Sequence, residues 1–273
     1  MTIPPKGRLV LVGAGRMGGA MLEGWLKQGI DRSKVSVLDP EPPKEVRALI
    51  KQSGLSFNPP INTLFDAQVV VIAVKPQIAG DVLPAIAALR DSLPLVVSIV
   101  AGKRLAFFEQ HFGARASIVR TMPNTPAAIG RGITAMVANR NVSREQLDLA
   151  GALLSAVGEV VTVESESQID AVTALSGSGP AYVFYLTECM TEAGTKLGLP
   201  KEMAAQLARA TVAGAAELMR TSGLPAGTLR QNVTSPNGTT QAALQILMAD
   251  DGMMKLFERA LTAAEKRSRE LAG

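Results

Sequence analysis

Three glycines near the amino terminus have the spacing of a phosphate-binding turn. Gly13, Gly15 and Gly18 form a G-x-G-x-x-G pattern, with Arg16 and Met17 before the last glycine. The first glycine would permit a sharp turn, the second would let backbone approach a pyrophosphate, and the third would allow close helix packing. The following helix would add its positive N-terminal end to the site. Because glycines also occur in ordinary loops, the pattern alone is weak evidence for dinucleotide binding.

An acidic residue follows at the distance expected for a nucleotide ribose. Asp39 comes after the apolar run Val35–Leu38, about 20 residues beyond the glycines, where a carboxylate can accept from a ribose 2′-hydroxyl. Its charge would repel the 2′-phosphate of NADPH, so Asp39 predicts NADH. Two alternatives stay open: Asp39-Pro40 could be a solvent-facing turn, and Lys44 could still reach a phosphate.

Polar clusters and short loops elsewhere in the chain could bind ligands. The clusters at residues 176–181 (SGSGPA) and 233–240 (VTSPNGTT) both precede helical patterns, and the second suits a carboxylate at a helix start. Each hydroxyl could equally be an ordinary N-cap. The loops Lys75-Pro76 and Met122–Pro126 follow predicted strands and could contact a cofactor or simply end those strands.

The chain has one histidine, His111, and one cysteine, Cys189. It therefore offers neither a Ser/His/Asp triad nor a Cys/His zinc site, and we expect no metal ion. Cys189 lies in an apolar helical stretch and is expected to be buried filler rather than a nucleophile. One cysteine cannot form an intramolecular disulfide, which fits a reducing cytoplasm. The sequence also shows no obvious general acid for a reductase. This is no obstacle if the substrate carries its own protonated imine, because such a group accepts hydride without an acid from the protein.

Short apolar runs alternating with helical patterns must position these residues. Strands are expected at Leu9–Val12, Val35–Leu38, Val69–Val74, Leu95–Ile99, Ser117–Thr121, Ile133–Val137 and Val160–Val163. Several are apolar throughout, which indicates burial on both faces of a parallel sheet. In such a sheet, ligands bind beyond the carboxyl ends of the strands. The predicted fold class is α/β, with a Rossmann-like, doubly wound, mostly parallel sheet over residues 1–163.

Helical periodicity replaces the β-rich runs from Ser165 onward. A helix opened by Pro200 has one apolar stripe, formed by Met203, Leu207, Ala210, Gly214 and Leu218. Many neighbouring residues are alanines, which allow close helix approach but bury little area each. A partner subunit or an ordinary intramolecular core would explain this pattern equally well. An all-helical second domain is predicted over residues 164–273.

Composition and charge exclude several classes of protein. Hydrophobic residues make up 47% of the chain and charged residues 19%, which is typical of a folded globular protein. The net charge of +4 comes from scattered residues, so nucleic acid is not an expected partner. The longest apolar runs fall well short of the roughly 20 residues that a membrane-spanning helix needs, so no membrane partner is expected.

Four longer motifs resemble the pyrroline-5-carboxylate reductase family, and the resemblance covers almost the whole chain. They are AVKPQ at 73–77, RTMPNTPA at 120–127, AVTALSGSGPAY at 171–182 and NVTSPNGTT at 232–240. The resemblance implies NAD(P)H-dependent reduction of 1-pyrroline-5-carboxylate to L-proline, the last step of proline biosynthesis, by hydride transfer to the cyclic imine carbon. It also implies a Rossmann-like domain and a helical domain that forms homodimers, often assembled into decamers, with the active site near the dimer interface.

The resemblance also assigns roles to residues. Ala73, Val74, Lys75, Pro76, Ala101 and Asn232 would line the cofactor together with the glycine turn. Ser235, Thr239 and Thr240 would hold the substrate, with the Thr240 hydroxyl near the imine nitrogen as the catalytic group, and Glu166 matches an acidic substrate-site residue.

The chain departs from the family pattern at two positions. Asn237 stands where the family commonly has the first of two glycines, which is tolerable because Asn adopts left-handed conformations more readily than most residues. Asp39 stands where many members carry Ser, Arg or Asn and use NADPH, so the choice between NADPH and NADH stays open.

Two other functions share part of this sequence pattern. A β-hydroxyacid dehydrogenase would need a lysine after its glycine-rich interdomain motif, and this chain has none between Lys103 and Lys196. A nucleotide sensor that kept the fold and lost the chemistry would not need Ser235 and Thr240.

Overall fold

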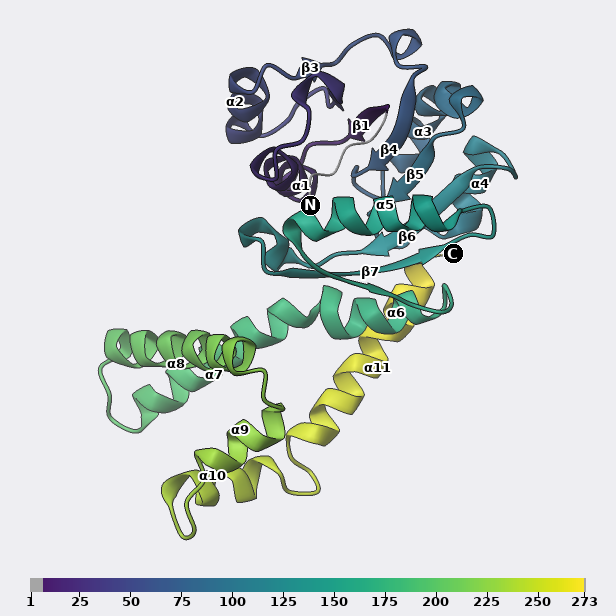
Figure 1. Cartoon of the computed structure of the whole chain (residues 1–273). Helices are drawn as coiled ribbons and strands as arrows, with labels where there is room; N and C mark the ends of the chain where they lie inside the picture. The colour runs from purple at the N-terminus through teal and green to yellow at the C-terminus, as the bar shows by residue number, and fades with distance from the viewer. Residues whose placement is uncertain (1–6, 273) are drawn as a thin grey trace. The chain divides into compact units, whose positions relative to one another are not determined.

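The computed structural model describes residues 7–272, which divide into two compact units (Figure 1). Among the described residues, unit 1 is residues 7–177 together with 264–272, and unit 2 is Ser178–Ala263. The expected domains began at residue 1 and ended at residue 273, and residues 1–6 and 273 lie outside the described residues. The expected domain boundary after residue 163 stays a prediction.

Unit 1 is built on one mostly parallel sheet. Its strands are β1 (Arg8–Val12), β2 (Val35–Leu38), β3 (Ser56–Phe57), β4 (Ala67–Ile72), β5 (Leu95–Ser98), β6 (Ser117–Met122), β7 (Gly132–Ala138) and β8 (Gly158–Thr162). They lie in the order β3-β2-β1-β4-β5-β6-β7-β8, and only β6 and β7 pair antiparallel. The predicted Rossmann-like, mostly parallel sheet is therefore confirmed. The two-residue strand β3 was not predicted, because it is too short to show a pattern.

Helices cover both faces of this sheet. They are α1 (Arg16–Lys27), α2 (Lys44–Gln52), α3 (Ala79–Ile86), α4 (Leu105–Phe112), α5 (Arg144–Leu154) and α6 (Gln168–Val172). Short 3-10 helices lie at Arg32–Lys34, Ile61–Thr63, Ala87–Ser92, Thr125–Ile129 and Ser155–Val157, and a π-helix lies at Thr173–Gly177.

The central strands β1, β4 and β5 are mostly apolar because each face of the sheet packs against helices. Along β1, Leu9 and Leu11 belong to the core that contains α1 and α5, whereas Val10 and Val12 belong to the core that contains α3 and α4. Alternate side chains of a strand point to opposite faces, so a strand buried on both sides needs no polar position. The buried indole of Trp25 in α1 donates to the carbonyl of Leu153 in α5 at 2.8 Å, which ties two covering helices together.

Unit 2 is entirely helical. It contains α7 (Gly179–Lys196), α8 (Lys201–Ser222), α9 (Ala226–Asn232), α10 (Thr239–Leu247) and most of α11 (Met253–Ala272), whose last turns belong to unit 1. The predicted all-helical carboxy-terminal part of the chain is therefore confirmed.

The side chains of α8 that are buried within the chain are not the large ones of the expected stripe. Ala204 and Ala208 are buried, whereas Met203 and Leu207 are 49% and 51% exposed. A Cβ on Gly194 of α7 would lie 3.4 Å from the Cβ of Ala204, so small residues let these two helices approach closely. An intramolecular core therefore does not account for the large apolar side chains of α8. Of the two explanations that the sequence allowed, contact with a partner subunit is the one left.

Cys189 is exposed, so the expectation of a buried filler residue is wrong. The reason is that α7 buries none of its side chains completely within the described chain. A side-chain hydrogen bond with Cys189 raises the pKa of Tyr185, one helical turn away. Within residues 7–272, no helix combines the length and apolar content that crossing a bilayer would require.

Candidate active site

The glycine turn lies at the point where the strand order of the sheet reverses. The chain passes from β1 outward to β2 and β3, and then returns to place β4 on the other side of β1. Ligands of doubly wound sheets bind beyond the carboxyl ends of the strands at such a point. Gly13 follows β1 and Ala73 follows β4, so the two expected cofactor segments meet there. The expected strand Val69–Val74 ends earlier than predicted, at Ile72, which leaves Ala73 and Val74 in the loop.

The three glycines of the turn have different surroundings. Gly13 has φ +89°, and a Cβ there would lie 2.7 Å from the carbonyl oxygen of Ala73. A Cβ on Gly18 would collide with the carbonyl oxygen of Gly13, so α1 packs against the turn that precedes it. A Cβ on Gly15 would meet nothing within 4 Å. Gly15 is also the N-cap of α1 and makes no side-chain cap, so open space adjoins the N–H groups of this helix start. These residues can accommodate the pyrophosphate of a dinucleotide.

Asp39 directly follows β2 and binds the glycine turn through its carboxylate. Oδ2 accepts from the backbone N–H of Ala14 at 2.6 Å, and Oδ1 accepts from that of Glu41 at 2.8 Å. The side-chain amide of Asn58 pairs with the backbone N–H and C=O of Asp39, at 2.8 and 2.9 Å. Asn58 adopts φ +47°, which Asn tolerates better than most residues. The carboxylate therefore lies against the glycine turn, and each oxygen keeps a lone pair for a ribose hydroxyl.

Other segments expected to line the cofactor lie in loops of the same sheet edge. Lys75 is exposed and Pro76 is partly exposed, in the loop between β4 and α3. Ala101 is exposed in the loop between β5 and α4, and the next residue, Gly102, has φ +70°. Since β1, β4 and β5 are adjacent and parallel, these loops leave the sheet side by side. Lys44 is exposed at the first position of α2, five residues beyond Asp39.

The loop after β6 contacts the SGSG segment. Asn124 donates through Nδ2 to the Ser176 hydroxyl at 3.2 Å, and its Oδ1 accepts from the N–H of Ile133 at 3.0 Å. A Cβ on Gly177 would collide with the Met122 side chain. The SGSG segment begins at the end of the π-helix Thr173–Gly177, a distortion often found at functional sites. Two motifs about 50 residues apart thus form one local structure, which the sequence did not indicate.

In unit 2, the first turn of α10 presents three hydroxyls. Thr239 and Thr240 are the first residues of the helix, and Ser235 lies in the turn before it, closed by the Gly238 N–H donating to the Ser235 carbonyl at 3.1 Å. A Cβ on Gly238 would collide with the Ser235 hydroxyl oxygen. Gly238 is the N-cap and provides no side-chain cap, and none of the three hydroxyls has a hydrogen-bond partner within residues 7–272. Free hydroxyls and N–H groups at a helix start suit a carboxylate.

Asn237, which stands where the family commonly has a glycine, adopts the left-handed backbone conformation with φ +58°. The expectation that Asn is tolerated there is confirmed. Its N–H donates to Oε1 of Gln241 at 2.5 Å, which fixes the loop against the first turn of α10. Asn232 ends α9 and is exposed five residues before Asn237.

Glu166 lies in unit 1, where it has two close partners. Its Oε1 accepts from Nη1 of Arg120 at 2.8 Å and from the N–H of Leu105 at 2.7 Å. The Arg120 side chain is only 3% exposed. Sequence reasoning assigned no role to Arg120, although an arginine within an otherwise apolar strand signals a buried partner.

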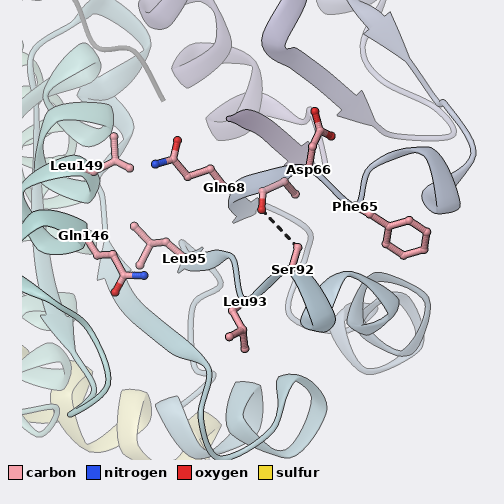
Figure 2. A pocket seen from close by; sticks show the side chains of 9 residues that line it. Phe65, Asp66, Gln68, Ser92, Leu93, Leu95, Gln146 and Leu149 are labelled. Carbon is pink, nitrogen blue, oxygen red and sulfur yellow. Dashed lines mark hydrogen bonds between the residues drawn. The ribbon is translucent and has the colours of Figure 1, made fainter. Parts of the chain in front are cut away.

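A hollow of about 380 Å³ lies at the opposite edge of the sheet, at the amino ends of β4 and β5 (Figure 2). Its polar side chains are already engaged: Gln68 accepts from the N–H of Gly7 at 2.8 Å, and Ser92 donates to the carbonyl of Leu89 at 2.7 Å. Because these groups are committed to backbone atoms, the hollow offers few free donors or acceptors. Within the described residues, no three His, Cys, Asp or Glu side chains gather closely enough to hold a metal ion.

Two family models match separate parts of the chain. The model described as pyrroline-5-carboxylate reductase dimerisation matches residues 166–271, and the model described as NADP oxidoreductase, coenzyme F420-dependent, matches residues 8–102. The pyrroline-5-carboxylate reductase of Pseudomonas aeruginosa is 42% identical over 265 residues, which cover 97% of this chain and 97% of that relative.

Solved structures agree with this result. A pyrroline-5-carboxylate reductase from Coxiella burnetii is 36% identical with a TM-score of 0.89, covering 98% of this chain and 99% of that one. The pyrroline carboxylate reductase of Plasmodium falciparum, solved with NADP bound, is 29% identical with a TM-score of 0.80, covering 97% and 98%.

Proposed function

The chain belongs to the pyrroline-5-carboxylate reductase family, and we propose how its residues reduce 1-pyrroline-5-carboxylate to L-proline. It is an oxidoreductase that uses a nicotinamide cofactor. The reduced nicotinamide supplies hydride to the imine carbon. The observation that carries the assignment of roles is the set of three hydroxyls at the start of α10 that have no hydrogen-bond partner among the described residues.

The glycine turn and the loops beside it are proposed to bind the cofactor. The open space at Gly15 and the free N–H groups of α1 suit the pyrophosphate. Arg16, Met17 and Gly18 follow in the first turn of α1. The further proposed cofactor-lining residues are Gly13, Asp39, Ala73, Val74, Lys75, Pro76, Ala101 and Asn232.

Ser235, Thr239 and Thr240 are proposed to hold the substrate. The start of α10 would bind the carboxylate through hydroxyls and backbone N–H groups, and the Thr240 hydroxyl would contact the imine nitrogen as the catalytic group. Glu166, in unit 1, is also proposed as a substrate-binding residue, and its Oε2 atom has no hydrogen-bond partner within residues 7–272.

We propose that Asp39 favours NADH over NADPH. Its carboxylate lies beside the glycine turn, where the 2′-substituent of the adenosine ribose is expected. A phosphate near this charge would be repelled, unless Lys44 offsets the repulsion.

The chain forms a homo-oligomer, as its dimerisation segment indicates. We propose that dimers assemble further into decamers, since large apolar side chains such as Phe184 and Ile246 stay exposed on several helices of unit 2. We propose a cytoplasmic location, because Cys189 is an exposed free thiol of the kind that a reducing compartment preserves.

Oxidation of NADH and of NADPH should be followed with and without 1-pyrroline-5-carboxylate, with proline identified as the product. We expect proline formation with both cofactors. Nucleotide binding without turnover would move the assignment to another imine or hydroxyacid substrate, or to a nucleotide sensor.

A further inference from the structure

The loop between β5 and α4 lies against Leu271, a residue near the far end of the chain. Gly102 has φ +70°, and a Cβ there would lie 3.2 Å from the carbonyl oxygen of Leu271. Lys103 Nζ lies 4.7 Å from the centroid of the Phe107 ring, which holds the loop onto α4. The N–H of Leu105 donates to Glu166 at 2.7 Å. The loop that carries Ala101 is thus held at three nearby positions, Gly102, Lys103 and Leu105.

Glu166 takes the place of a missing helix cap. Arg104 is the N-cap of α4 and makes no side-chain cap bond. The Glu166 carboxylate accepts from the first N–H of this helix and puts a negative charge at its positive end. Arg120, buried in β6, holds the same oxygen at 2.8 Å from the other side. Since a buried guanidinium needs a partner, Glu166 is fixed between the sheet and the helix start.

We propose that Glu166 is a positioning residue for the nucleotide, acting through the first turn of α4 on the loop that carries Ala101. This inference rests on the proposed contact between Ala101 and the cofactor. Glu166 and Leu271 both belong to the segment that matches the dimerisation model, although both lie in unit 1 with the sheet. Nucleotide affinity therefore depends on residues far outside the matched oxidoreductase region, residues 8–102.

The test compares Glu166→Ala and Glu166→Gln in the full chain. The dissociation constants of NADH and NADPH are measured by titration calorimetry, and the KM of the imine is measured at saturating nucleotide. Glu166→Ala should raise both dissociation constants about tenfold, because charge-assisted hydrogen bonds to α4 and Arg120 are lost. The KM of the imine, which the proposed substrate-site role of Glu166 would also affect, should rise by less than these dissociation constants. Glu166→Gln keeps an acceptor oxygen for Leu105 and should stay within about threefold of the unsubstituted chain.

The matched control is Asp148→Ala, which removes an exposed ion pair with Arg144 in the same unit and should leave nucleotide binding unchanged. If Glu166→Ala does not fold, removal of residues 271–273 withdraws the support at Gly102 instead and should also weaken nucleotide binding. Unchanged dissociation constants in the folded variant, or a raised KM for the imine alone, would overturn the proposal. An Ala101→Leu variant that binds both nucleotides normally would show a different failure, namely that this loop does not contact the cofactor.

Discussion

Thr240 illustrates how little chemistry the protein must supply for this reduction. Its hydroxyl is half-buried in the first turn of α10 and has no partner within the described residues. A protonated imine already accepts hydride, so a positioned hydroxyl near the nitrogen would orient the ring and stabilise the developing amine.

Thr240→Ala should therefore lower kcat/KM for the imine by about ten- to a hundredfold, the equivalent of one lost hydrogen bond to a charged group. The dissociation constant of the nucleotide should change little. Steady-state kinetics with Thr240→Ser, which keeps the hydroxyl, serve as the control. Unchanged kinetics in Thr240→Ala would remove this residue from the mechanism.

The charge of Asp39 is expected to set the cofactor preference. Asp39→Ser should shift the ratio of kcat/KM values toward NADPH by about tenfold or more, because a charge facing the 2′-phosphate is removed. This variant also loses the bond to the Ala14 N–H, whereas Asp39→Asn can keep it and removes only the charge. A shift in Asp39→Ser that Asp39→Asn does not share would assign the effect to the shape of the glycine turn. An unaltered ratio in both variants would mean that the carboxylate does not face the ribose.

At the scale of elements, the end of α11 is attached to α6 by a buried hydrogen bond. The Ser268 hydroxyl donates to Oδ1 of Asp170 at 2.7 Å, and the two residues are 7% and 4% exposed. These residues are 98 positions apart, so the bond fixes the last turns of the chain to unit 1. A buried carboxylate that loses a donor retains the cost of its desolvation.

Ser268→Ala should lower the free energy of unfolding by about 1–3 kcal/mol. Urea unfolding followed by circular dichroism measures this change. Thr262→Ala is the matched control, because Thr262 lies on the same helix and its hydroxyl bonds only to the exposed Glu258 carbonyl. Equal midpoints for the Ser268 and Thr262 variants would show that the buried bond contributes no net stability.

At the scale of the whole molecule, the exposed apolar side chains of unit 2 require a partner. Large apolar side chains on α7 and α8 are 45% to 64% exposed, namely those of Val183, Phe184, Met203, Leu207 and Leu218. Apolar side chains gathered in this way mark interaction surfaces, and this segment matches the dimerisation model.

Leu207→Glu should dissociate the homo-oligomer, because a charge would be buried without a partner at the interface. Sedimentation velocity would show a single-chain species at micromolar concentration, and activity should fall with it. Phe65→Glu, at a 55% exposed apolar residue of unit 1, should keep the oligomer intact. An unchanged sedimentation coefficient for Leu207→Glu would place the interface elsewhere. The unsubstituted chain in the same experiment distinguishes a dimer from the proposed decamer.

The sequence by itself determined the elements whose patterns are local. The glycine turn, the apolar strands and the helical second half each depend on residues within a few positions of one another, and burial on both faces of the sheet leaves a continuous apolar run. The family motifs then indicated that the hydroxyls at the start of α10 bind a ligand. The hydrophobic pattern of the sequence could not have distinguished these hydroxyls from ordinary N-caps.

The tertiary structure alone decided which distant residues meet. Glu166 bonds to Arg120, 46 positions away, and Asp39 bonds to Ala14, 25 positions away. It also decided that alanines, not the large residues of the expected stripe, pack within the chain on α8. Such contacts depend on strand order and helix approach, which bring together segments whose local sequences carry no signal of each other.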